Sequence, residues 1–167
     1  MKKQGFTLIE LMVVIVIMGI LAAVAVPKLF GMIAKSKASE VGPAAGTYVK
    51  LQDAYASESN QLGGWVLIGY TAPGTKTSGS QFATTNFTYT STPDGNATVA
   101  LTTAGAAMNG GWIATANVAL NDCPSGATWT LNVTGATDGV TYANVYSNQS
   151  DCQPLTPSFG QIGTKAN

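Results

Sequence analysis

The 167-residue sequence predicts an α+β protein, in which one long N-terminal helix packs on an antiparallel β-sheet head. Three observations lead to this class. An uncharged apolar run lies near the N-terminus, and apolar residues continue beyond it at three- and four-residue spacing. From residue 60 onwards, short β-branched and aromatic runs alternate with turn signals. The connections between these runs are too short for crossover helices, which favours antiparallel pairing.

The apolar run predicts a membrane segment. Leu11–Val26 is 16 residues long without a charge, and 20 helical residues cover the hydrocarbon layer of about 30 Å. The basic pair Lys2–Lys3 before it predicts a cytoplasmic N-terminus. A cleaved secretory signal peptide is the alternative. Against it, the run is longer than the usual apolar region of a signal peptide, and no good small-x-small site closes it before Pro27.

The first 30 residues resemble the start of a type IV pilin precursor. The resemblance rests on the basic leader Lys2–Gly5, then Phe6–Glu10, then an apolar helix with Gly19 and Pro27. It implies the type IV pilin fold, cleavage of the Gly5–Phe6 bond by a prepilin peptidase and N-methylation of Phe6. A leader of five residues is similar to that of the shorter-leader, type IVa pilins. The remainder of the chain agrees only in its general layout.

The resemblance divides the chain into four parts. They are a leader peptide (1–5), a transmembrane and filament-core helix (6–28), an amphipathic helix packed on the head (29–59) and a β-rich globular head with a disulfide-bounded C-terminal loop (60–167). The precursor is expected in the inner membrane and the processed protein in an extracellular pilus, or fimbrium.

Glu10 is the one ionisable residue between Lys3 and Lys28. A charged side chain at the centre of a membrane costs about 2.5–3.5 kcal/mol, so it normally has a partner. The ammonium group that cleavage creates on Phe6 is the expected partner, on the same or on a neighbouring chain. An intermolecular pair would favour one axial register, because a slipped helix leaves an unpaired charge in apolar surroundings. The alternative is a solvated interfacial carboxylate without a role in assembly.

Two places in the helix are expected to break or bend. Pro27 removes an amide donor and Gly19 lowers helix propensity, so the span between them should loosen, and the resemblance implies that it unwinds in the assembled pilus. Gly and Pro are also tolerated in membrane helices without any such role. Gly42–Pro43 predicts a second bend or short break, followed by helix to about Ser59.

An apolar stripe continues beyond Pro27 and is expected to pack on the sheet. It comprises Ala34, Ala38, Val41, Ala45, Tyr48, Gln52 and Tyr55. In the head, strands are expected at 64–70, 86–91, 97–103, 111–120, 128–134 and 140–146, with a hairpin turn at Asp138–Gly139. Trp65, Trp112 and Trp129 are interpreted as core residues.

Cys123 and Cys152 are the two cysteines, and their spacing fits neither a redox CxxC motif nor a four-ligand zinc site. In an exported protein a disulfide is favoured over two separate buried thiols. The bond would bring Asp122 and Asp151 together, either as turn carboxylates or as a calcium site, the first being favoured.

The composition argues against an enzyme, a cofactor or a metal site. The sequence contains no His, formal net charge is +0, and no catalytic constellation or phosphate-binding glycine loop is present. The Lys35–Lys50 cluster is balanced by acids, so no specific nucleic acid is inferred. Four Asn-x-Ser/Thr sequons occur, at Asn86, Asn96, Asn132 and Asn148, but they assign no glycosylation.

By resemblance, the expected function is that of a pilus structural subunit. Such a subunit polymerises with itself through N-terminal helices into a helical fibre for adhesion, motility or uptake. Its partners are a prepilin peptidase, the inner-membrane assembly machinery and, before assembly, the membrane. The cysteine pair resembles the disulfide-bounded loop of pilin heads and favours a major pilin. The alternatives are a minor pilin, a major pseudopilin of a type II secretion system, or a membrane-anchored binding protein that does not polymerise.

Overall fold

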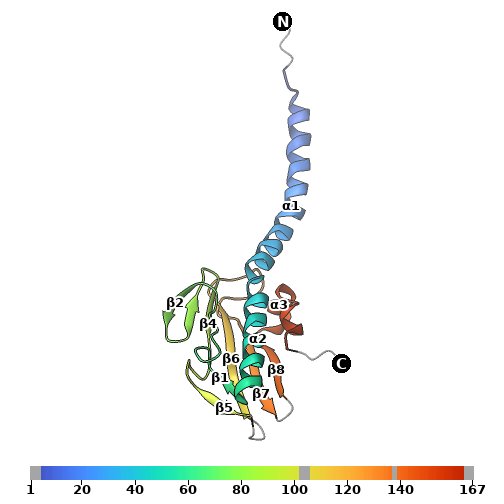
Figure 1. Cartoon of the computed structure of the whole chain (residues 1–167). Coiled ribbons are helices and arrows are strands. Elements are labelled where there is room, and N and C mark those ends of the chain that lie inside the picture. Colours follow the sequence, from blue (N-terminus) through green and yellow to red (C-terminus); the bar gives the residue numbers. More distant parts are fainter. Residues whose placement is uncertain (1–4, 102–105, 137–138, 164–167) are drawn as a thin grey trace.

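The computed structural model of the chain describes residues 5–101, 106–136 and 139–163. A long helix projects from a β-rich head, and its second half lies against that head (Figure 1). The helices and strands, in chain order, are α1 (Leu8–Ala38), α2 (Val41–Ser59), β1 (Gln61–Gly63), β2 (Thr75–Ser78), β3 (Gln81–Ala83), β4 (Phe87–Thr90), β5 (Thr98–Ala100), β6 (Ala106–Ala116), β7 (Thr128–Ala136), β8 (Gly139–Tyr146), α3 (Gln149–Cys152) and the 3₁₀ turns η1 (Gln153–Leu155) and η2 (Phe159–Gln161).

Helix α1 is continuous through Gly19 and Pro27, so the break expected between them is absent from the single chain. A proline inside a helix withholds one backbone N–H, and here the neighbouring turns keep the helix together. The interruption falls at Ser39–Glu40, between α1 and α2. Gly42 and Pro43, where the second break was expected, lie inside the first turn of α2. The amides of a first turn have no partner in their own helix, so a proline costs little there.

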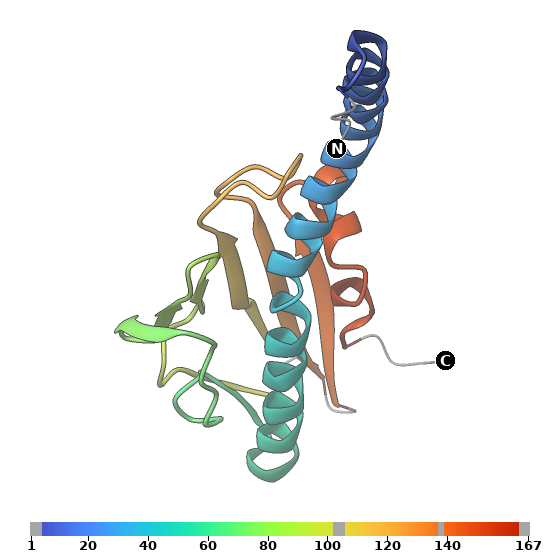
Figure 2. The ribbon, with the colours of Figure 1, turned by 90° about the horizontal axis from the view of Figure 1, so that it is seen from above.

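Strands β2–β3–β4–β6–β7–β8 form a six-stranded antiparallel sheet, and β1 pairs with β5 in a second, two-stranded sheet. Figure 2 shows α2 crossing one face of the larger sheet, with the C-terminal turns beside it. Five of the six expected strands are confirmed, as β4 to β8. The β7–β8 hairpin closes from Ala136, which pairs with Gly139; Asp138 of the expected turn lies outside the described residues.

The expected strand at 64–70 is wrong, because this segment is a series of tight turns. The amide of Tyr70 donates to the carbonyl of Trp65 at 2.8 Å, and Gly69 has φ +68°. Gly64 also lies against the chain at Gly95, where an added Cβ would be 2.5 Å from the carbonyl oxygen. The strands β2 and β3 were not expected, since β2 is exposed along its whole length and shows no alternation of apolar residues.

The apolar stripe packs against the sheet as predicted. Six of its seven residues are buried, and Tyr55 is half-buried. Gln52 is the one polar member with no exposed surface. With its amide nitrogen toward Gly63 O (2.8 Å) and its oxygen toward Gly63 N (3.0 Å), the side chain satisfies the backbone of β1. A polar residue is therefore tolerated in this stripe, because its side-chain amide forms the hydrogen bonds that the Gly63 backbone of β1 needs.

The three tryptophans are core residues, as predicted. None has more than 1% of its surface exposed. Each indole N–H has a partner: Trp65 donates to Gly111 O at 2.8 Å, Trp112 to Tyr70 Oη at 2.8 Å, and Trp129 to Thr156 Oγ1 at 2.7 Å. Burying an indole without such a bond would cost free energy, so these bonds fix the ring orientations as well as filling the core.

Candidate functional site

The surface of α1 is the first candidate functional feature, because its apolar side chains face outward in every direction. Residues 5–30 are all exposed, and the first buried side chain of α1 is Ala34. Within the described residues, one helical segment is long and apolar enough to cross a membrane, with mean hydropathy 2.9 in its most apolar window and none of that window buried. An apolar surface of this extent requires a lipid or protein partner.

Glu10 and Thr7 form a reciprocal cap at the start of α1. Glu10 Oε2 accepts from the backbone N–H of Thr7 at 2.8 Å and from Thr7 Oγ1 at 2.7 Å. The N–H of Glu10 in turn lies 3.4 Å from Thr7 Oγ1. The sequence analysis missed Thr7, although Thr7–Glu10 is the T-x-x-E pattern typical of a capping box. Glu10 therefore stabilises the helix start of its own chain, and pairing with Phe6 remains a prediction.

The expected cleavage site precedes this cap. Gly5 and Phe6 are outside α1, which begins at Leu8. Phe6 is 87% exposed, and a Cβ added at Gly5 would have no heavy atom within 4 Å. The remainder of the expected leader, residues 1–4, lies outside the described residues. The Gly5–Phe6 bond thus lies outside the helix on exposed backbone, and its cleavage remains a prediction.

Cys123 and Cys152 are joined in a disulfide across a sequence separation of 29, and both are fully buried. Each is preceded by an aspartate that accepts from a neighbouring asparagine amide: Asp122 from Asn121 at 2.7 Å and Asp151 from Asn148 at 2.9 Å. Across the described ranges, no group of three or more His, Cys, Asp or Glu side chains could hold a metal ion. Turn carboxylates, the favoured interpretation, fit these contacts.

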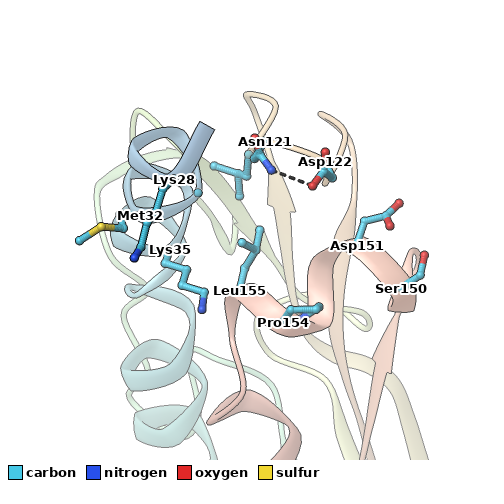
Figure 3. A pocket seen from close by; sticks show the side chains of 11 residues that line it. Lys28, Met32, Lys35, Asn121, Asp122, Ser150, Asp151, Pro154 and Leu155 are labelled. Carbon is cyan, nitrogen blue, oxygen red and sulfur yellow. Dashed lines mark hydrogen bonds between the residues drawn. The ribbon is translucent and has the colours of Figure 1, made fainter. Parts of the chain in front are cut away.

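A groove of about 450 Å³ separates α1 from the two segments that the Cys123–Cys152 bond joins, 120–123 and 150–155, which are called the disulfide-linked loop below. Figure 3 shows Lys28, Met32 and Lys35 on the helix side, with Asp122 and Asp151 on the opposite side. The groove is not predictable from the sequence, because nothing in the local pattern places residue 28 near residue 151.

Comparisons with known proteins match part of the chain. A family model described as the prokaryotic N-terminal methylation motif matches residues 1–26. The type IV major pilin protein PilA of Myxococcus xanthus is 39% identical over 69 residues, covering 37% of this chain and 31% of that protein. The type IV major fimbrial protein FimA of Dichelobacter nodosus is 56% identical over 39 residues, covering 23% of this chain and 25% of the relative.

A third relative, the fimbrial protein EcpC of Eikenella corrodens, is 54% identical over 44 residues, covering 26% of this chain and 29% of that protein. The chain thus spans less than a third of the length of each of these curated relatives. No solved structure matches the chain significantly. The family-model match includes the Glu10 cap and most of the exposed apolar part of α1.

Proposed function

We propose that this chain, a type IV pilin by its N-terminal methylation segment and its α+β fold, is the structural subunit of a pilus that polymerises through α1. The observation that carries the proposal is the apolar surface of α1, exposed on all sides over residues 5–30. A bilayer covers this surface in the precursor, and the helices of neighbouring subunits cover it in a fibre. Leaving this surface in water would cost roughly 25 cal/mol per Å², so it has to be covered in either setting.

Processing precedes assembly in this proposal. A prepilin peptidase removes the leader 1–5 at the exposed Gly5–Phe6 bond, and Phe6 becomes the N-methylated terminus. The new ammonium group would stand four residues before Glu10 in the sequence, and the second oxygen of that carboxylate would be its partner. Oε2 holds the Thr7 cap, which leaves Oε1 for a charge from the same or the next subunit. Pairing between subunits would select one axial register.

The named relatives are major pilins or fimbrial proteins, which favours a major pilin over a pseudopilin or a minor pilin. The disulfide-bounded C-terminal loop agrees with this choice. Inner-membrane assembly machinery supplies the work of polymerisation, and the chain itself acts as a structural component. An extracellular fibre of this kind would serve adhesion, motility or uptake.

Electron microscopy of fibres sheared from the cell surface, combined with mass spectrometry of their protein, tests the proposal. Abundant fibres should consist of this chain beginning at N-methylated Phe6, with the two cysteines resistant to alkylation until a reductant is added. A chain that still begins at Met1 within assembled fibres would contradict the processing step. Absence of this chain from all fibres, with the protein retained in the membrane, would favour a non-polymerising anchor instead.

A further inference from the structure

The groove between α1 and the disulfide-linked loop has two walls of opposite charge. Lys28 and Lys35 project from α1, whereas Asp122 and Asp151 belong to the loop (Figure 3). Apolar side chains lie between and around them: Met32, Leu120, Pro154 and Leu155. The disulfide fixes the anionic wall, because Cys123 and Cys152 directly follow the two aspartates and their Cα atoms are 4.9 Å apart.

The charges of the two walls do not neutralise one another within the chain. For the described residues, neither lysine makes an ion pair or hydrogen bond. The Oδ2 atoms of Asp122 and Asp151 accept from asparagine amides, and their Oδ1 atoms remain available to a cation. The groove therefore presents two ammonium groups on one side and two carboxylate oxygens on the other. This arrangement favours a zwitterionic ligand, with its anion toward α1 and its cation toward the loop.

The position of the groove relative to a bilayer restricts the choice of ligand further. Leu8 to Pro27 is the first 20 residues of α1, which cover about 30 Å as a helix and match the hydrocarbon layer. Lys28 then lies at the membrane interface on the side of the head. Lys35 is about 10 Å further along the axis, and its long side chain can extend back toward the interface. The mouth of the groove is thus at the level of the lipid headgroups.

We propose that this groove binds the headgroup of an ethanolamine phospholipid while α1 spans the membrane. The lipid phosphate contacts Lys28 and Lys35, and the ethanolamine ammonium donates to Oδ1 of Asp122 and Asp151. A choline headgroup has the same charges, but its trimethylated nitrogen has no N–H to donate. A glycerol headgroup offers the phosphate alone. The inference goes beyond fibre formation and depends on α1 as a membrane span, not on polymerisation.

The test uses the full chain in maltoside micelles, supplied with equal amounts of ethanolamine, choline and glycerol phospholipids of the same acyl chains. Native mass spectrometry then measures which lipid the protein retains. The wild type should retain the ethanolamine lipid in at least fivefold excess over the choline lipid. Lys28→Gln with Lys35→Gln should lower retention of both the ethanolamine and the glycerol lipid, by about fivefold for each lysine removed.

Variants of the two aspartates test recognition of the headgroup amine separately from attraction to the lipid phosphate. Asp122→Asn with Asp151→Asn should abolish the preference for ethanolamine over choline and leave retention of the glycerol lipid undiminished. Lys50→Gln and Glu58→Gln are matched controls, since both residues are exposed on α2 and outside the groove. Intact disulfide and unchanged tryptophan fluorescence would establish that each variant is folded.

Three results would overturn the inference. They are equal retention of the three lipids by the wild type, groove variants that behave like the two controls, or groove variants that change cross-linking between copies of the chain and leave lipid retention unaltered. The last result would assign the groove to subunit contacts. Fibre yield is measured separately, so a failure of lipid binding is distinguishable from a failure of the pilus proposal.

Discussion

The hydroxyl of Tyr142 donates to Oδ1 of Asp53 across 2.6 Å, joining β8 to α2. The same hydroxyl lies 3.3 Å from the carbonyl of Val49, one turn earlier in the helix. Before the first turn of α2, Glu40 Oε1 accepts from Tyr89 Oη at 3.0 Å and from Thr84 Oγ1 at 2.7 Å. Tyrosine–carboxylate contacts therefore hold the helix to the sheet at two well-separated points.

Replacing Tyr142 with Phe should lower the free energy of unfolding by about 1–2 kcal/mol, because a hydrogen bond to a carboxylate is lost and the ring packing stays. The change in the free energy of unfolding is measured by denaturing the full chain in micelles while tryptophan fluorescence is monitored. Tyr55→Phe is the control, since no hydrogen bond of its hydroxyl is found within the described part of the chain. Equal losses in the two variants would contradict a role for the Asp53 contact.

Stability should fall as the pH rises above about 10. Burial raises the pKa of Tyr48, Tyr70, Tyr89 and Tyr142 above the ordinary value of 10.0. The folded state therefore binds these protons more tightly than the unfolded state does. The contribution to stability is complete below the unfolded pKa and is lost as the pH rises above it. Tyrosinate absorbance and tryptophan fluorescence should change together in one cooperative alkaline transition; tyrosinate formation with unchanged fluorescence would argue against it.

Gly111→Ala should destabilise the head by roughly 1–3 kcal/mol, the usual cost of overpacking. The added Cβ would lie 2.5 Å from Tyr48 Oη and 3.0 Å from Val133 Cγ2. The hydroxyl of Tyr48 is also buried without a hydrogen-bond partner among the described atoms. Tyr48→Phe should therefore leave stability unchanged or raise it, and the double variant should recover part of the loss. Additive effects, measured by thermal unfolding, would rule out this contact as the cause.

Glu10→Gln should abolish or strongly reduce fibres counted by electron microscopy, because an uncharged amide cannot pair with the Phe6 ammonium. Thr7→Val is the matched variant, since it removes the hydroxyl part of the cap and keeps the charge. It should cost the helix start about 1 kcal/mol and leave assembly largely intact. If Thr7→Val abolished fibres as completely as Glu10→Gln, the function of Glu10 would be capping and not pairing.

The packing of the helix on the sheet is predictable from the sequence. The helix face that is buried has to be apolar, and this requirement appears as the three- and four-residue spacing of Ala38, Val41, Ala45 and Tyr48. Strands whose side chains alternate between buried and more exposed positions, such as β7, are equally predictable from the sequence. The segment 64–70 resembles a strand in its sequence because it is rich in apolar residues, of which Trp65, Ile68 and Tyr70 are buried by contacts distant in sequence. Composition alone does not distinguish such a segment from a buried strand.

The candidate functional features also divide into those that a local sequence pattern predicts and those that depend on tertiary packing. Glu10 and the Gly5–Phe6 bond are local in sequence, so their pattern points to them directly. Thr7 is equally local, because the T-x-x-E spacing of a capping box is visible in the sequence. The groove could not be foreseen, because it needs Lys28 of one element and Asp151 of another to meet through tertiary packing.

The two tyrosine–carboxylate contacts of α2 also determine how the molecule carries tension. Residues 5–30 are exposed, so a pull along α1 reaches the head first where Ala34 and Ala38 are buried and then through the Ser39–Glu40 junction. The force then acts along α2, parallel to its interface with the sheet, in shear. Bonds loaded in shear must break together, whereas bonds that are peeled break one at a time. Through Glu40 and Asp53, much of the resistance to such a pull is thus expected at the interface of α2 with the sheet.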